Sequence, residues 1–177
     1  MKKILSIAFI ATGLMIAIHS TAQDKPVDKS KRPSPPAKVE QKLKSGATIS
    51  IDYSQPSVKG RTIGKDLEPM DKKVWRTGAN EATVFETDKE VTIQGSKLPA
   101  GKYGLFTLFD GNDVTVIFNK TWNQWGAFTY KDADDALRVN AKATDEKSSE
   151  EKMTFKISPS GVVTLLWGPR KVDFKVM

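Results

Sequence analysis

Hydrophobic and polar residues alternate along most of the chain, and the alternation has the two-residue period of β-strands. In residues 47–53, Ala47, Ile49, Ile51 and Tyr53 occupy alternate positions, and small or charged residues occupy the others. Such a strand buries one face and exposes the other. Further strands with this pattern or with apolar residues on both faces are expected at 39–43, 83–86, 91–93, 103–109, 114–118, 137–141, 153–157, 162–167 and 172–176.

Turn residues separate these segments. Ser45-Gly46 and the stretches 110–113 and 159–161 have the glycine, asparagine, serine and proline content of hairpin turns. Residues 131–136 favour one short helical turn, and the charged stretch 142–152 favours a solvated hairpin loop. About nine or ten strands with frequent turns predict an all-β fold, an antiparallel β-sandwich of the jelly-roll or Ig-like type.

The first 23 residues have a different pattern. Lys2 and Lys3 precede an apolar run over residues 4–18, and small residues follow it. These features predict a signal-peptide helix that is cleaved near Ala22 or Gln23. The run is shorter than the roughly 20 residues of a membrane span, so no permanent span is expected after cleavage. No cysteine follows the run, which excludes a lipoprotein anchor. We therefore expect export to the periplasm or the extracellular space.

Residues 24–37 carry four prolines among alternating charges, which predicts a flexible, extended linker. The folded domain is then expected over residues 38–177, and no internal repeat interrupts it. Loss of Lys2 and Lys3 with the leader lowers the formal net charge from +7 to +5. Scattered lysines without a basic-aromatic motif do not indicate a nucleic-acid partner.

Composition limits the chemistry that the domain can carry out. The chain has no cysteine, and its one histidine, His19, lies in the leader. Nucleophilic catalysis by Ser-His-Asp or Cys-His groups is therefore excluded, as are histidine- or cysteine-ligated zinc sites. We expect no metal site and no cofactor. Carboxylate, amide, hydroxyl, guanidinium and aromatic groups remain for binding.

Two stretches break the alternation. Residues 56–80 form a long segment rich in glycine, proline and charge, and loops of that length in a compact domain are usually functional or disordered. Residues 119–130 read NKTWNQWGAFTY and combine four aromatic side chains with amide groups. Aromatic faces beside amides suit a ligand platform, and they also suit a plug that closes one end of a sandwich.

The stretches YSQPSVKGRTIG, VWRTGANEAT, LPAGKYGLFTLF and VIFNKTWNQWGAF follow one another in this order. Together they resemble the DUF2911 family over about residues 33–167. The resemblance implies an exported all-β domain of the kind found in Bacteroidetes and related bacteria. That family has no assigned function, so the resemblance supplies no catalytic residues. Gly64 departs from the aromatic residue expected before the glycine of this motif, which affects the packing of that loop.

From these stretches we predict a binding patch that holds a small polar, glycan-like or anionic ligand. Arginines would form forked hydrogen bonds to an anion, and tryptophans would stack on an apolar ring face. The candidate ligand-binding residues are Arg61, Trp75, Arg76, Asn80, Glu81, Asn119, Gln124 and Trp125.

Two alternatives stay open. In the first, the domain is a hydrolase in which Glu81 acts as a base with a second carboxylate from Asp52, Asp66, Glu68 or Asp71. In the second, the domain is purely structural: Trp75 plugs the sandwich, Arg76 pairs with Glu81, and the aromatic stretch closes one end. We expect a non-enzymatic binding or interaction domain, with Glu81 as the one candidate catalytic residue.

Overall fold

The computed structural model describes residues 28–177, so the predicted signal peptide and the start of the predicted linker lie outside the described residues. The described part is mostly antiparallel β-structure, with two short 3-10 helices, η1 (Lys29–Lys31) and η2 (Asp132–Asp134). The strands are β1 (Pro36–Lys42), β2 (Thr48–Ser54), β3 (Val74–Trp75), β4 (Thr83–Thr87), β5 (Val91–Ile93), β6 (Ser96–Leu98), β7 (Gly101–Asp110), β8 (Asp113–Asn119), β9 (Asp135–Ile157) and β10 (Val162–Lys175).

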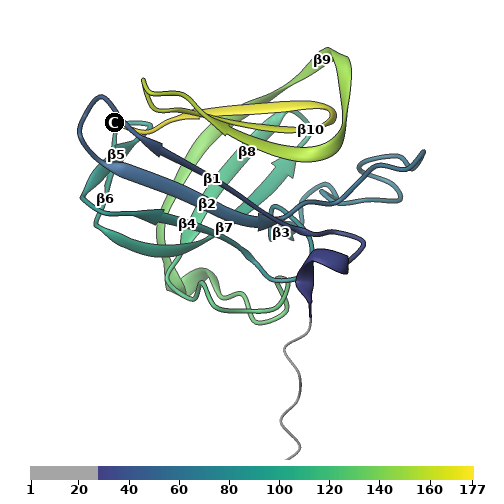
Figure 1. Cartoon of the computed structure of the whole chain (residues 1–177), viewed down its shortest axis with the longest axis horizontal. Coiled ribbons are helices and arrows are strands. Elements are labelled where there is room, and N and C mark those ends of the chain that lie inside the picture. Colours follow the sequence, from purple (N-terminus) through teal and green to yellow (C-terminus); the bar gives the residue numbers. More distant parts are fainter. Residues whose placement is uncertain (1–27) are drawn as a thin grey trace, which may run out of the picture.

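Seven strands form one antiparallel sheet in the order β1-β2-β4-β7-β8-β9-β10, and β3 pairs with β7. Strands β5 and β6 form a separate hairpin. The large sheet curls, so that the β9–β10 hairpin lies across from β1 and β2 (Figure 1). The result is an all-β, sandwich-like fold, as the alternation predicts. The three predicted hairpin turns join β1 to β2, β7 to β8 and β9 to β10.

The core fills the space inside the curl. The ring of Tyr53 on β2 meets Phe155 on β9 edge to face, with ring centroids 5.1 Å apart. Phe118 on β8 touches both Phe85 on β4 and Phe174 on β10 in the same edge-to-face manner. These aromatic contacts join strands from opposite sides of the curl, so burial of the alternating apolar residues is what holds the layers together.

A smaller cluster lies on the other face of β7 and β8. Phe106 and Ile117 are fully buried there, and Ala127 and Tyr130 from the aromatic stretch pack over them. Gly104 allows this close approach, because a Cβ at that position would lie 3.3 Å from the carbonyl oxygen of Thr121. Residues 120–130 are thus held against the sheet face.

Two sequence predictions about strands were wrong in extent. Residues 142–152 are part of the continuous strand β9, not a hairpin loop. Residues 144–152 of β9 are exposed apart from half-buried Glu150, so charged side chains are tolerated at successive positions there. The two predicted strands 162–167 and 172–176 are one strand, β10, with register shifts around Gly168. Strands β3 and β6 were not predicted.

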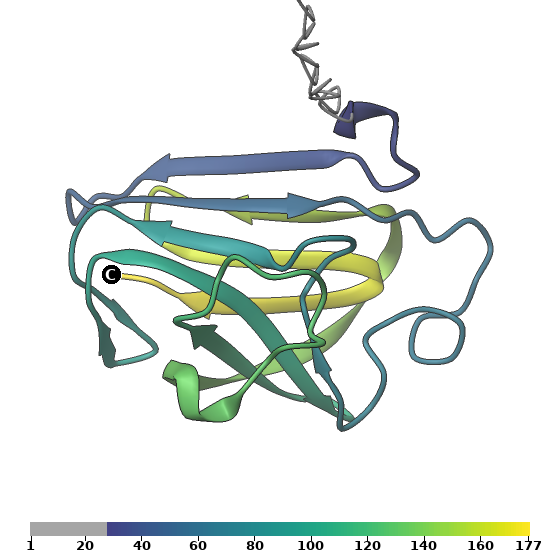
Figure 2. The ribbon, with the colours of Figure 1, turned by 90° about the horizontal axis from the view of Figure 1, so that it is seen from below.

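The chain before the sheet is in contact with the domain. Strand β1 begins at Pro36, within the stretch that the sequence assigned to the linker, and runs along the outer edge of the sheet (Figure 2). The backbone N–H of Gln55 donates to the carbonyl oxygen of Pro35 at 2.8 Å, which extends this pairing. Within residues 28–177, none of the helices has the length and apolar character to cross a bilayer.

Candidate functional site

The loop after β3 presents part of the predicted patch. Trp75 is 2% exposed, and its indole N–H donates to the carbonyl oxygen of Gly78 at 3.1 Å. The hydroxyl of Thr83 donates to the carbonyl oxygen of Thr77 at 2.8 Å. Thr77 and Asn80 both adopt positive φ, which a non-glycine residue tolerates only where its surroundings hold it. These contacts fix a tight turn that ends at Asn80 and Glu81.

The aromatic loop, residues 119–130, joins this turn through backbone hydrogen bonds. The N–H of Ala82 donates to the carbonyl oxygen of Gln124 at 2.9 Å, and the N–H of Gly126 donates to that of Asn80 at 3.0 Å. Glu81 and Trp125 form the isolated bridge between them. The two loops thereby bring Asn80, Glu81 and Trp125 together.

The segment before β1 binds to these three residues. Nη1 of Arg32 donates to both carboxylate oxygens of Glu81 at 2.9 Å, and Nζ of Lys29 lies 3.0 Å from one of them. The Arg32 guanidinium also lies 5.8 Å from the ring centroid of Trp125, in cation–π range. Nδ2 of Asn80 donates to the carbonyl oxygen of Ser34 at 3.0 Å. We call Asn80, Glu81 and Trp125 the arginine clamp, and residues 29–34 the strap.

These contacts change the electrostatics of Glu81. Burial by itself raises the pKa of the carboxyl group, but the hydrogen bonds from Arg32 and Lys29 outweigh it and lower the pKa to about 2. Glu81 is therefore ionised at any physiological pH. The structural alternative paired Glu81 with Arg76, and that prediction was wrong, because the cations on Glu81 come from the strap.

Arg76 is half-buried and has an unusual environment. Among residues 28–177, no carboxylate lies within 4.0 Å of its guanidinium, and its buried Nε has no hydrogen-bond partner. Burial lowers its pKa, and the charge of Glu68 offsets this only in part. A Cβ on Gly126 would lie 3.6 Å from Nη1 of Arg76 and 2.9 Å from the ring of Phe128, so all three are neighbours.

Three other predicted site residues have structural contacts. Trp75 is a core residue, as described above. Asn119 is fully buried and donates from Nδ2 to the carbonyl oxygen of Lys131 at 2.9 Å and to Asp135 at 2.8 Å. Gln124 is 9% exposed and donates to the carbonyl oxygen of Thr121 at 2.6 Å. These side chains shape the aromatic loop from within.

Sequence reasoning missed Asp135, which anchors the end of the aromatic loop. Its side chain is 6% exposed and accepts hydrogen bonds from the hydroxyl of Tyr130 and from Nε of Arg138, both at 2.7 Å. Burial and the bond to Asp135 raise the pKa of Tyr130 to about 12. Arg32 was missed as well, because its proline-rich surroundings indicated a linker. Neither residue has a local sequence signal that distinguishes it from ordinary surface charges.

Arg61 lies apart from the clamp, in a cavity of about 570 Å³ beneath the long loop. Nε and Nη2 of Arg61 donate to the carbonyl oxygens of Val58 and Ser57, so the side chain is tied to its own loop. Arg170 lines the same cavity, with its guanidinium 5.9 Å from the ring centroid of Phe109, and it also pairs with Asp145. The predicted patch is thus divided between two places.

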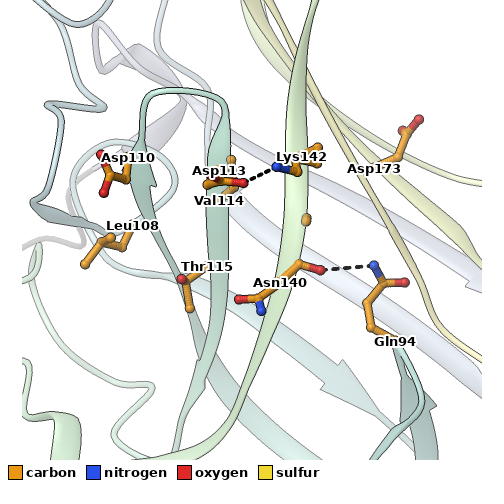
Figure 3. A pocket seen from close by; sticks show the side chains of 10 residues that line it. Gln94, Leu108, Asp110, Asp113, Val114, Thr115, Asn140, Lys142 and Asp173 are labelled. Carbon is orange, nitrogen blue, oxygen red and sulfur yellow. Dashed lines mark hydrogen bonds and ion pairs between the residues drawn. The ribbon is translucent and has the colours of Figure 1, made fainter.

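A second cavity, of about 530 Å³, contains none of the predicted residues. It lies beside the β7–β8 turn and β9, and Figure 3 shows Lys142 paired with Asp113 on its wall. Nε2 of Gln94 donates to the backbone carbonyl oxygen of Asn140 at 3.1 Å across another side. The other two carboxylates of its lining, Asp110 and Asp173, pair with Lys72 and Lys171, which lie outside the lining. In the part of the chain that the structure describes, no cluster of three or more carboxylates could hold a metal ion.

The fold and the site define an exposed polar and aromatic face on an all-β domain. Residues 34–176 match the family model described as "Protein of unknown function (DUF2911)", so the chain belongs to the DUF2911 family. The search of curated proteins and the search of solved structures each gave no match. The family match confirms the resemblance seen in the sequence; it covers every described strand but, of the strap, only Ser34.

Proposed function

We propose that this chain is an exported, non-enzymatic binding domain of the bacterial envelope that holds an anionic group of a small ligand at Arg76. Export is supported by the leader pattern of residues 1–23. The anion is supported by one observation, the half-buried guanidinium of Arg76 without a carboxylate partner in residues 28–177. Buried polar groups in native proteins nearly always have partners, and an exception requires an explanation.

The chemistry of arginine indicates the ligand class. A guanidinium offers five N–H donors in a planar fork, which matches the oxygens of a carboxylate or a phosphate. A bound anion would supply the missing charge partner for Arg76. Phe128, next to Gly126 and 83% exposed, offers an apolar ring face to the rest of the ligand. A small molecule with an anionic group beside a sugar or other ring has these features.

The hydrolase alternative receives less support from the same geometry. A general base works best with a pKa near the operating pH, and the pKa of Glu81 is about 2. Its oxygens are also engaged by Arg32 and Lys29. The structural alternative accounts for Trp75, Asn119 and Gln124, whose polar atoms are bonded within the domain. It gives no role to the unpaired Arg76.

The proposal is tested by thermal shift with carboxylates, phosphates, sugar acids and peptidoglycan fragments. A ligand that binds only the folded state stabilises it by RT ln(1 + [L]/Kd), or about 2.7 kcal/mol at a hundredfold excess over Kd. We expect a concentration-dependent rise in Tm that is lost in Arg76→Ala and reduced in Arg76→Lys. Arg61→Ala is the matched control, because it removes an arginine from the separate loop cavity.

The outcomes are distinguishable. A shift that survives Arg61→Ala and disappears in Arg76→Ala supports the proposal. A shift that disappears in Arg61→Ala and survives Arg76→Ala places the ligand in the loop cavity and rejects Arg76 as its anchor. Absence of any shift across the anion series also rejects it.

A further inference from the structure

The strap binds to the arginine clamp through chemistry that recognises peptides. The carboxylate of Glu81 accepts hydrogen bonds from Arg32, and the indole of Trp125 lies in cation–π range of the same guanidinium. The amide of Asn80 donates to the backbone carbonyl oxygen of Ser34. Arginine differs from lysine in combining planar hydrogen bonding with stacking on aromatic rings. The clamp therefore contacts both a specific side chain and the main chain two residues further on.

The sequence of the strap suits an extended ligand. Arg32 is followed by Pro33, Ser34, Pro35 and Pro36. Proline fixes φ and disfavours helix in the residue before it, so such a segment loses little conformational entropy when it binds. The strap is in effect a basic, proline-rich peptide that is covalently attached to its own binding site.

The contacts between the strap and the arginine clamp are partly exposed and individually weak, so they can break and re-form. The side chains of Arg32, Glu81 and Lys29 are 22%, 37% and 57% exposed, and ion pairs that remain in contact with solvent contribute little to stability. Trp125 itself is 54% exposed. The strap precedes β1, so its release leaves every strand of the sheet paired. A peptide of the same chemistry can then take its place.

We propose that the arginine clamp is a recognition site for an extended, arginine-containing, proline-rich peptide segment, and that the chain's own strap occupies it until such a partner competes. The tether gives the strap an effective concentration on the order of millimolar. A partner peptide displaces the strap only if it binds the clamp more tightly than the strap does or is present locally at a comparable concentration. This inference requires Asn80, Glu81 and Trp125, and it does not depend on anion binding at Arg76.

The test opens the clamp without removing any part of the fold. Protein purified after expression of the full-length chain is prepared as wild type, as Arg32→Ala, and as the double variant Arg32→Ala/Glu81→Gln. The probe is a synthetic peptide of the sequence KSKRPSPP, residues 29–36, and the control peptide has alanine in place of its arginine. The readout is the indole N–H resonance of Trp125 in a ¹⁵N–¹H correlation spectrum, assigned with Trp125→Phe.

In Arg32→Ala we expect the Trp125 resonance to move from its wild-type position and to return toward it as the KSKRPSPP peptide is added. Binding to wild type should be weaker by about tenfold or more, because the tethered strap competes. The double variant and the control peptide should each lose about tenfold or more in affinity, since the charge partner or the guanidinium is missing. The indole signals of buried Trp75 and Trp167 report whether the fold is intact.

Three results would overturn the inference. An identical Trp125 resonance in wild type and Arg32→Ala would show that the strap does not occupy the clamp. Equal affinity of the two peptides for Arg32→Ala would show that the clamp does not recognise arginine. Movement of the Trp75 and Trp167 signals together with that of Trp125 in Arg32→Ala would show that Arg32 has a purely structural role.

Discussion

Replacement of Arg76 by methionine should stabilise the unliganded domain. Methionine fills a similar length of space without a charge, and it removes the cost of the buried Nε that has no partner. A buried donor without a partner costs about 1–3 kcal/mol. The attraction to Glu68 recovers a part of this, so the net gain expected from Arg76→Met is about 1–2 kcal/mol. For a domain of this size, that gain raises Tm by about 2–6 °C.

Arg138→Met is the matched control for this prediction. Arg138 donates to Asp135 and to Tyr130, both at 2.7 Å, so its removal leaves a buried carboxylate without its cation. We expect this variant to lose about 1–2 kcal/mol. Both variants are measured by urea unfolding of protein without added anions. The reasoning is refuted if Arg76→Met destabilises the domain as Arg138→Met does, because Arg76 would then have a structural partner.

Two further predictions concern the clamp. The pKa of Glu81 falls from an ordinary 4.5 to about 2 on folding, so its contribution to stability is present above about pH 5 and is lost as pH falls toward 2. Because this group is partly exposed and screened by solvent, the contribution amounts to about 1 kcal/mol. It is measured as the pH-dependent difference in unfolding free energy between wild type and Glu81→Gln. Trp75→Ala should cost about 3–5 kcal/mol in urea unfolding and Trp125→Ala less than about 1 kcal/mol, because only Trp75 is a core residue; similar costs would contradict this division.

The strands were predictable because the alternation of apolar and polar residues and the turn residues that indicate them are local in the sequence. The apolar face expected in residues 47–53 is buried in β2, although Ser50 and Ser54 on the other face are buried too. The turn residues at 45–46 and 110–113 lie between paired strands. Residues 142–152 were misjudged for a physical reason. Residues 144–152 of β9 have no buried face to impose alternation, so their sequence resembles that of a solvated loop.

The candidate site was only partly predictable. Asn80, Glu81 and Trp125 were singled out from their residue types, and the structure brings them together. The partner of Glu81 could not be inferred, because Arg32 lies 49 positions away and nothing in a proline-rich stretch indicates a docking contact. Asn119 and Gln124 are hydrogen-bonded within the aromatic loop, and residue type alone does not distinguish such internal supports from ligand-binding amides.

The curl of the main sheet also determines how its borders are protected. Hydrogen bonds cross from the β1–β2 side to β9 and the turn after it: Lys44 donates to the carbonyl oxygen of Pro159 at 2.9 Å, Val58 to that of Glu151 at 2.8 Å, and Met153 to that of Pro56 at 3.0 Å. Unpaired strand borders are templates for fibril growth. In the described sheet β1 and β10 still pair with a neighbouring strand on one side only. On β1, Pro36 and the exposed charged side chains of Lys38, Glu40 and Lys42 oppose pairing with a foreign strand, so this border should resist amyloid formation even when the domain is crowded.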